Sequence, residues 1–273
     1  MIAPLQRVER AIWRRQGFAA GERAIPEETA VAFTYDGGAY AVMMATPQDL
    51  EDFACGFSLT EGVVGAVDEI ETLEIREEEL GIELRMRLKP SRGAAFGERR
   101  RHLAGPTGCG LCGIESLAEA VRAPRPVQST ASFRPDEIMA ALEALTRAQA
   151  LNRETRAVHA AGFWRPGEGL APVREDVGRH NALDKLAGAL ARRGIDAAQG
   201  FVVFTSRVSV EMIQKAAAIG VPLSVAVSAP TALAVRMADA AGMTLAAVAR
   251  ADSFEIFTHP GRIKAETAAQ NVA

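Results

Sequence analysis

The chain has 273 residues, of which 48% are hydrophobic and 24% are charged. This length can bury a full hydrophobic core and lies where one core begins to divide, so we expect two coupled lobes. The formal net charge of −3 and an isoelectric point near 5.9 exclude a global basic field. Nucleic acid and anionic membranes are therefore not expected as main partners.

The amino terminus and the cysteine count bear on where the protein works. Residues 1–16 carry four arginines without a continuous apolar run, so they lack the hydrophobic region of a secretory signal. No stretch approaches the roughly 18 apolar residues of a spanning helix. Three cysteines are too few, and odd in number, for a secreted disulfide scaffold. We therefore expect a cytoplasmic protein.

The first part of the chain is dominated by β-type patterns. Two runs, 29–35 and 39–44, flank Asp36-Gly37-Gly38, a turn sequence that tolerates positive φ, which predicts a hairpin. Thr46 is expected to cap the helix that follows. Alternating apolar and charged residues over 82–88 predict a strand with one wet face. The first lobe is thus expected to be β-rich with one clear helix.

In the second half, helical and strand patterns alternate. The predicted helices cover 135–149, 180–192, 210–219 and 232–241, and the predicted strands cover 158–164, 171–177, 201–204, 223–227 and 244–248. Short apolar strands between helices indicate a largely parallel sheet covered on both faces. Prolines 124 and 126 mark a boundary near residue 125. The predicted class is α/β (α+β overall), with a β-rich lobe over 1–125 and an α/β domain over 126–273.

One loop stands out for its chemistry. Gly108-Cys109-Gly110-Leu111-Cys112-Gly113 places two thiols among glycines, immediately before a helical pattern. Glycines let the backbone approach another molecule, and free N–H groups at a helix start stabilise a thiolate. Both features favour an exposed, reactive sulfur, so Cys109 and Cys112 are the candidate catalytic residues. Cys55, inside a predicted helix, is interpreted as a buried small hydrophobe.

Three other chemistries use a cysteine pair of this spacing. Structural zinc needs two further ligands, but no second C-x-x-C exists and the four histidines are scattered. A zinc deaminase pairs H-x-E with P-C-x-x-C, whereas here no histidine is followed by Glu at that spacing and Gly108 precedes Cys109. No permanently bound metal is therefore expected. Thiol–disulfide redox chemistry stays open beside other thiol chemistry.

Four further motifs, together with the cysteine loop, resemble the formate dehydrogenase accessory sulfurtransferase family, FdhD. They are Gly56 to Gly62, Asp176 to Lys185, Thr205 to Met212 and Phe257 to Arg262. The resemblance implies a cytidine-deaminase-like three-layer C-terminal domain and a homodimer. It also implies that Cys109 accepts sulfur as a persulfide from a cysteine desulfurase. The sulfur then passes to the molybdenum bis-guanine-dinucleotide cofactor destined for formate dehydrogenase.

The resemblance also assigns contacts for this polyanionic cofactor, whose phosphates favour backbone N–H groups, helix N-termini and cations. The assigned residues are Phe257, Thr258, His259, Pro260, Gly261 and Arg262, and Ser206 and Arg207 join them because of their place in the sequence after an apolar run. Phe257 would pack on a ring and Arg262 would meet phosphate or guanine. The other interpretation of this segment is a surface turn with a solvated arginine. Arg207 follows an apolar run, at a strand end where open α/β sheets bind ligands.

Two questions stay open at this point. Asp176, Arg179, His180 and Lys185 form a polar cluster at a strand-to-helix junction, where capping and ligand roles are both compatible with the sequence. Two alternative functions also remain: a dithiol–disulfide oxidoreductase, and a chaperone that escorts the molybdenum cofactor without chemistry. Cys112 is expected to assist sulfur release.

Overall fold

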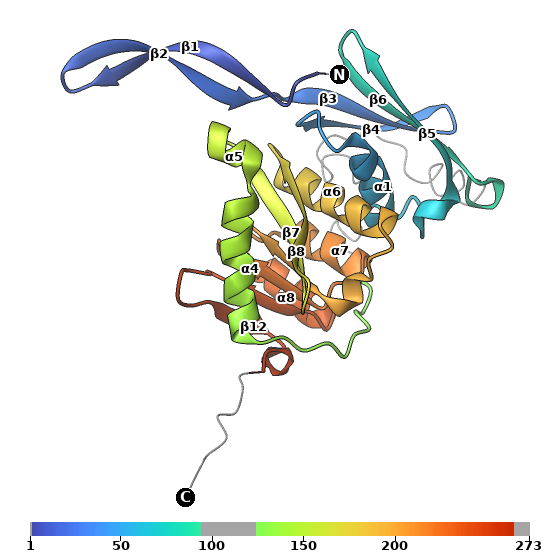
Figure 1. Cartoon of the computed structure of the whole chain (residues 1–273). Helices are drawn as coiled ribbons and strands as arrows, with labels where there is room; N and C mark the ends of the chain where they lie inside the picture. The colour runs from blue at the N-terminus through green and yellow to red at the C-terminus, as the bar shows by residue number, and fades with distance from the viewer. Residues whose placement is uncertain (1, 94–123, 265–273) are drawn as a thin grey trace, which may run out of the picture. The chain divides into compact units, whose positions relative to one another are not determined.

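The computed structural model describes residues 2–93 and 124–264 and shows a mixed α/β fold (Figure 1). The helices are α1 (Leu50–Thr60), α4 (Pro135–Ala148), α5 (Ala150–Thr155), α6 (Arg179–Arg192), α7 (Val210–Ala218) and α8 (Ala232–Ala240). The strands are β1 (Leu5–Arg14), β2 (Gly17–Pro26), β3 (Thr29–Tyr35), β4 (Gly38–Ala45), β5 (Ile70–Glu78), β6 (Gly81–Leu88), β7 (His159–Arg165), β8 (Gly169–Asp176), β9 (Phe201–Phe204), β10 (Leu223–Ala226), β11 (Thr244–Ala247) and β12 (Glu255–Thr258).

The strands form sheets of two, four and six strands. Their orders are β1–β2, then β4–β3–β6–β5, and then β12–β11–β10–β9–β7–β8. The predicted mixed α/β class is confirmed. Among the helices of the described residues, none is long and apolar enough to cross a membrane.

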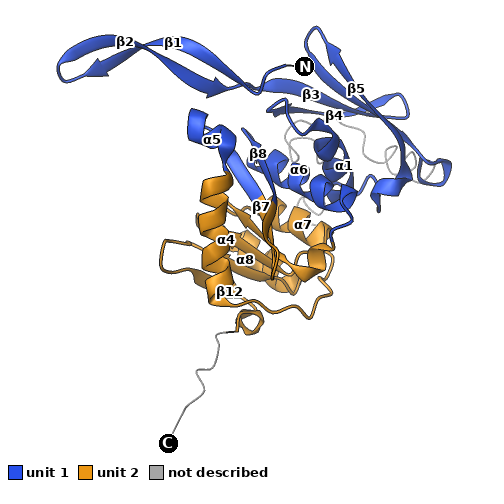
Figure 2. Cartoon of the chain, in the orientation of Figure 1, with its two compact units in different colours: residues 1–122, 149–161, 172–195 blue, residues 123–148, 162–171, 196–273 orange. Residues whose placement is uncertain are grey.

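By its internal contacts, the chain divides into two units (Figure 2). Unit 1 comprises residues 1–122, 149–161 and 172–195, and unit 2 comprises residues 123–148, 162–171 and 196–273. The sequence predicts a single boundary near residue 125, whereas the contacts assign several segments to each unit. The segment that contains α6 belongs to unit 1 because α6 packs extensively against α1.

Unit 1 is built on the four-stranded sheet. Its hairpin of β3 and β4 is the one predicted, and the turn holds Asp36 at φ 49° and Gly37 at φ 80°, both left-handed. β6 pairs parallel to β3 and antiparallel to β5. Alternate residues of β6 from Ile82 to Leu88 are buried, which confirms the predicted period of two.

One face of this sheet packs against α1. Phe33 of β3 stacks on Phe57 of α1 with ring centroids 4.0 Å apart, and it meets Phe53 edge-on at 5.0 Å. All three rings are buried. The hydrophobic core of unit 1 therefore lies between the sheet and this helix.

The start of α1 differs from the prediction. The helix begins at Leu50, and the residue before it is Asp49, which adopts a left-handed φ of 52° and makes no side-chain cap. Thr46, predicted as the cap, is fully buried and is hydrogen-bonded to residues 176, 177 and 185. The predicted cap is wrong because these long-range bonds occupy Thr46.

The helices α1 and α6 cross at two glycines. A Cβ atom on Gly56 would lie 1.7 Å from the carbonyl oxygen of Asp184, and one on Gly188 would lie 1.9 Å from the carbonyl oxygen of Asp52. Cβ atoms essentially never approach main-chain oxygens so closely, so neither position accepts a side chain without movement of a helix. The two backbones are therefore in direct contact at this crossing.

β1 and β2 form a long antiparallel ribbon that the sequence analysis did not predict, here called the arm (residues 5–26) (Figure 1). Most of its residues are exposed, including Trp13 at 67% and Phe18 at 80%. β2 contacts α5. Charged residues interrupt any regular alternation of apolar residues in the arm, which removes the usual sign of a strand.

Unit 2 is built on the short apolar strands β9, β10 and β11. These strands run parallel, and β12 is antiparallel to β11 at the edge of the sheet. Every residue of β9, β10 and β11 is buried. The three predicted strands and their parallel arrangement are thus confirmed, as is typical of strands buried on both faces. α4 contacts β9, and α8 contacts β11.

Candidate functional site

The candidate reactive residues Cys109 and Cys112 lie outside the described residues. The cysteine among the described residues is Cys55 on α1, which is 5% exposed. Burial raises the pKa of its thiol to about 11. A thiol with such a pKa stays protonated at neutral pH and is a poor nucleophile, in agreement with the interpretation of Cys55 as a buried small hydrophobe.

The carboxyl ends of the parallel strands form one edge of unit 2, where Ser206 and Arg207 follow β9. Ser206 is buried, and its hydroxyl donates to the main-chain oxygen of Arg207 at 3.1 Å. The side chain of Arg207 is exposed. An exposed guanidinium at this edge suits a phosphate or carboxylate ligand, since ligands of open α/β sheets bind outside the carboxyl ends of strands.

The segments after β10 and β11 meet at the same edge. The N–H of Val248 donates to the carbonyl of Ser228 at 3.3 Å, and the N–H of Ala249 donates to the carbonyl of Ala226 at 3.2 Å. Val248 has a φ of 53°, a left-handed conformation that is strained for a β-branched residue. Strained backbone of this kind clusters at ligand-binding sites. The carboxyl edge thus combines an exposed cation with a strained connection.

β12 holds the first two residues of the second group of predicted cofactor contacts, Phe257 to Arg262, and the other four follow it. It runs antiparallel to β11, so Glu255 pairs with Ala247 at the carboxyl end of β11, and Thr258 pairs with Leu245. Beyond Thr258 the chain therefore continues past the amino end of β11.

The turn Pro260–Arg262 is held at that amino end. The hydroxyl of Thr244 donates to the carbonyl of His259 at 2.9 Å, and the guanidinium of Arg262 donates to the carbonyl of Gly242 at 3.0 Å. The first predicted group, Ser206 and Arg207, follows the carboxyl end of β9. The structure therefore places the turn and the first group at opposite edges of the parallel strands and does not bring them together.

The side chain of Arg262 is used inside the fold. Besides Gly242, it donates to the carbonyl oxygens of Ser129 at 3.0 Å and Ala131 at 3.5 Å. Its Nε is buried and has no hydrogen-bond partner among the described residues. Burial lowers the pKa of the guanidinium. Arg262 thus links separate loops of unit 2 and is not the solvated arginine of a surface turn.

The other members of the second group divide between exposed and structural roles. The hydroxyl of Thr258 is buried and donates to a main-chain oxygen at 2.7 Å. His259 adopts a left-handed φ of 44°, and its Nε2 lies 3.3 Å from a carboxylate oxygen of Asp239. Pro260–Gly261 is exposed, and Phe257 is 37% exposed. The rings of Phe257 and of His259, whose side chain is 40% exposed, are therefore both accessible to a ligand.

The polar cluster at the start of α6 contains a fully satisfied buried carboxylate. Asp176 accepts hydrogen bonds from the N–H groups of Thr46 and Gly178 at 3.0 and 2.7 Å. It also accepts from Asn181 Nδ2 at 2.9 Å and from the ammonium of Lys185 at 2.6 Å. Asp176 and Lys185 are both 0% exposed. This pair joins the Thr46 segment to β8 and α6, which is a structural role.

Three basic side chains lie near the same helix start. Burial lowers the pKa of His159, and the charges of Arg179 and His180 lower it further. The Nε of Arg179 is buried without a hydrogen-bond partner among the residues that the structure describes.

Residues 2–93 and 124–264 contain no cluster of three metal-ligating side chains.

One charged group was missed by the sequence analysis. Asp52 on α1 is 5% exposed and accepts hydrogen bonds from Arg174 at 2.5 Å and from Arg192 at 2.6 Å. The pairs connect α1 with β8 and α6. The acidic first turn of α1, Glu51 and Asp52, was the only local signal, because both arginines lie more than a hundred residues further along the chain.

The fold just described is that of a solved accessory protein. The crystal structure of a candidate formate dehydrogenase accessory protein from Desulfotalea psychrophila matches it with a TM-score of 0.77, covering 95% of this chain and 99% of that one. The two sequences are 24% identical. This likeness establishes a shared fold.

Sequence similarity establishes the family. A profile of the FdhD/NarQ family matches residues 26–264. The sulfur carrier protein FdhD of Agrobacterium fabrum is 55% identical over 262 residues, which cover 96% of this chain and 97% of that protein. The sulfur carrier protein FdhD of Cupriavidus necator is 50% identical over 254 residues, covering 93% and 88%. The chain belongs to the FdhD/NarQ family.

Proposed function

We propose that this protein is a sulfur carrier that takes sulfur from a cysteine desulfurase and delivers it to the molybdenum bis-guanine-dinucleotide cofactor of formate dehydrogenase. The observation that carries the proposal is the family match over residues 26–264, a range that includes Cys109 and Cys112. Relatives at 55% and 50% identity are named as sulfur carriers. The proposal includes a cytoplasmic location and a homodimer.

The proposed chemistry begins with a thiolate on Cys109. It attacks the outer sulfur of the desulfurase persulfide, a new S–S bond forms on Cys109, and the desulfurase cysteine leaves as a thiolate. No external oxidant is needed. Cys112 then attacks the inner sulfur of Cys109, so that a disulfide forms and the outer sulfur leaves, reduced, as sulfide for the cofactor. A thiol reductant restores both cysteines for the next cycle.

The proposed cargo contacts follow from the exposed members of the predicted set. Arg207 would meet phosphate at the carboxyl edge of the sheet, the edge that also carries the strained Val248. Phe257 would pack on a ring of the cargo. The guanidinium of Arg262 donates to main-chain oxygens of the protein and its Nε is buried, so Arg262 would hold the turn in place and would not contact the cargo directly.

Mass spectrometry of the full chain after incubation with a cysteine desulfurase and cysteine tests the proposal. We expect an adduct of about 32 Da, one sulfur atom, that maps to Cys109 and is removed by a thiol reductant. Cys109→Ala should abolish the adduct, and Cys112→Ala should keep it but slow its release. Cys55→Ala is the matched control, because a buried thiol with a raised pKa should not load.

Two other outcomes would contradict sulfur transfer. An intramolecular disulfide between Cys109 and Cys112 without any adduct would indicate thiol–disulfide redox chemistry. Activation of formate dehydrogenase that survives the loss of both cysteines would indicate an escort for the cofactor.

A further inference from the structure

The arm is a ribbon with little support. A two-stranded hairpin alone is marginally stable in water, and the arm's main contact in the described part of the chain is that of β2 with α5. Among the strands of residues 2–93 and 124–264, none pairs with the outer side of β1. Trp13 and Phe18 form an exposed cross-strand pair near the turn. The outer edge of β1 therefore presents unpaired main-chain N–H and C=O groups, a ready template for another strand.

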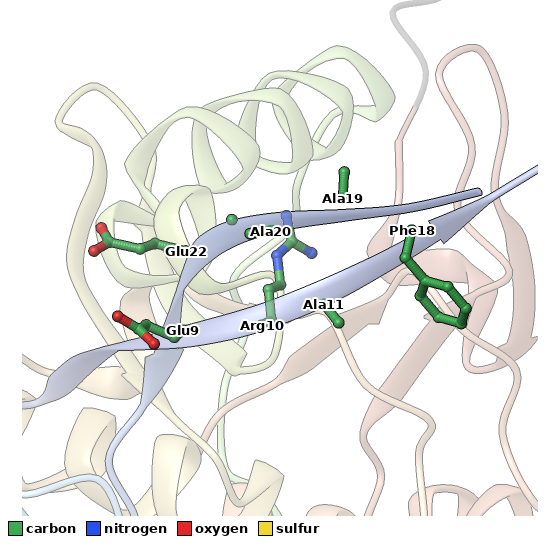
Figure 3. Close-up of a pocket in the computed structure, with 8 residues that line it drawn as sticks. Glu9, Arg10, Ala11, Phe18, Ala19, Ala20 and Glu22 are labelled. Carbon is green, nitrogen blue, oxygen red and sulfur yellow. The ribbon is translucent and has the colours of Figure 1, made fainter. Parts of the chain in front are cut away.

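The arm is also basic in an acidic protein. Residues 5–26 hold five arginines and two glutamates, whereas the whole chain has a net charge of −3. Figure 3 shows Glu9 and Glu22 side by side on the paired strands, while Arg10 and Phe18 extend away from them. Arg10 and Arg14 are exposed, and neither forms an ion pair with another described residue. The arm thus offers uncompensated positive charge along β1.

The same chain carries an edge strand of the opposite charge. From Asp68 to Glu79 the sequence contains seven carboxylates and one arginine. β5 lies at the edge of the four-stranded sheet, and Glu74 and Glu78 are exposed on it. Ile75 is 37% exposed, and Leu80, in the turn that follows, is 90% exposed. β5 therefore presents carboxylates, apolar side chains and unpaired main-chain groups together.

The main-chain groups free for pairing can be assigned in both strands. Each hairpin closes with a two-residue turn, between Arg14 and Gly17 in the arm and between Glu78 and Gly81 after β5. The pair that flanks such a turn exchanges hydrogen bonds within its own hairpin. In every second residue counted back from Arg14 or Glu78, the main-chain N–H and C=O groups therefore point to the partner strand of the same hairpin. In the residues between them, these groups point to the free edge.

One antiparallel register aligns the free main-chain groups of the two strands and also forms two ion pairs and one apolar pair. It pairs Trp13 with Ile75, Arg14 with Glu74, and Arg10 with Glu78. Trp13 and Ile75 both face their free edges, so they can exchange main-chain hydrogen bonds. Because the two arginines and the two glutamates are each four residues apart, both ion pairs form on one face, and the apolar pair forms on the other.

We propose that the arm of one protomer adds to β5 of a second copy of this chain in that register, and that the exchange is reciprocal. Each dimer then holds two identical contacts, as two-fold symmetry requires. Within one chain, β1 and β5 belong to different sheets and do not pair. The inference gives an interface to the proposed homodimer and depends on no step of the proposed sulfur chemistry.

Two charge-reversed variants of the full chain test the interface by sedimentation equilibrium. The arm variant is R10E/R14E, and the strand variant is E74R/E78R. We expect the unmodified chain to be a dimer at micromolar concentration, and each variant alone to dissociate at least tenfold more readily, because like charges then face each other. Raising the ionic strength should also weaken the unmodified dimer.

An equimolar mixture of the two variants is the decisive sample. In a mixed dimer, the reversed arm meets the reversed strand and the native arm meets the native strand, so both contacts are complementary again. The mixture should therefore regain the dimer that neither variant forms alone. A folding defect cannot produce this rescue. R134E/R147E is the control for the arm variant, since it lowers the net charge by the same amount at exposed positions outside the arm and β5 and should leave the dimer intact.

Three outcomes overturn the inference. They are an unmodified chain that remains a monomer at all concentrations, variants that dimerise as tightly as the unmodified chain, and a mixture no more dimeric than its components. Persulfide loading of Cys109 is read separately by mass spectrometry, so failure of the interface and failure of the sulfur chemistry can be told apart.

Discussion

The interior of unit 1 and the interior of unit 2 are stabilised by different kinds of interaction. The contact between α1 and α6 in unit 1 depends on two glycines and on buried polar groups, among them Asp176 and Lys185. The strands β9, β10 and β11 of unit 2 are almost entirely apolar; Ser224 and Thr244 are their polar residues. A buried polar group needs its own partner in one position, whereas apolar side chains of similar volume can replace one another. Unit 1 should therefore tolerate small changes far less than unit 2.

The largest loss should follow Gly188→Ala. The added Cβ would lie 1.9 Å from the main-chain oxygen of Asp52, which cannot rotate away, so the two helices must separate. We expect the free energy of unfolding to fall by more than about 4 kcal/mol, or no folded protein to be recovered. Urea denaturation followed by circular dichroism measures the change. Gly261→Ala is the control, because nothing lies within 4 Å of its Cβ position, and similar losses in both would contradict the direct helix contact.

The next largest loss should follow Lys185→Met. This change leaves the buried carboxylate of Asp176 with hydrogen-bond donors but without a counter-ion, at a cost of about 3 kcal/mol or more. In the double variant D176N/K185M the uncompensated charge is gone, so the double variant should be more stable than K185M. Urea midpoints compare the two. A double variant less stable than K185M would show that the uncompensated charge of Asp176 is not the cause of the lost stability.

A smaller loss is expected from Val225→Ala in the core of unit 2. Val225 is 0% exposed, and removing two methyl groups should cost about 2 kcal/mol. Val225→Ile should cost less than about 1.5 kcal/mol if the neighbouring apolar groups adjust. The same urea titrations provide the measurement. Losses equal to those of Gly188→Ala would remove the contrast between the units.

The smallest effect concerns pH. The pKa of His159 is lowered by burial and by Arg179 and His180, so below its usual value of about 6.5 the unfolded chain binds more protons than the folded chain. This contribution to stability is complete above that value and is lost as the pH falls toward the lowered pKa. In His159→Gln the decline of the urea midpoint from pH 7 to pH 5 should be shallower. Equal slopes in both proteins would contradict a titrating His159.

The sequence predicted much of unit 2 because the relevant signal is local there. The apolar runs at 201–204, 223–227 and 244–248 coincide with β9, β10 and β11 to within one residue. Continuous apolar runs between helices are typical of strands that are covered on both faces. The composition of a few consecutive residues is therefore sufficient to predict these strands.

The polar elements of unit 1 could not be predicted in the same way. Thr46-Pro47-Gln48-Asp49 has the local form of a helix start, yet the partner of Thr46 is Asp176, which is 130 residues away. The arm and β5 were missed because exposed edge strands carry charged residues in place of a regular apolar alternation.

The candidate site residues were chosen without knowledge of the edges of the sheet. Position after an apolar run selected Ser206 and Arg207, and resemblance selected residues 257–262, but no local pattern shows that β12 is antiparallel and carries the chain to the opposite edge of the sheet. The role of Arg262 was hidden for a similar reason, because the carbonyl oxygens that it binds belong to residues between 20 and 133 positions away.

The left-handed backbone at Val248 bears on any effort to make this protein resistant to heat. Such a conformation costs a β-branched residue about 1–3 kcal/mol, whereas glycine adopts it freely. Val248→Gly would therefore relieve local strain, but it would also loosen the connection between the ends of β10 and β11, at the same edge of the sheet as the exposed Arg207. At this one residue, a higher melting temperature would come with a less rigid edge to hold the cargo.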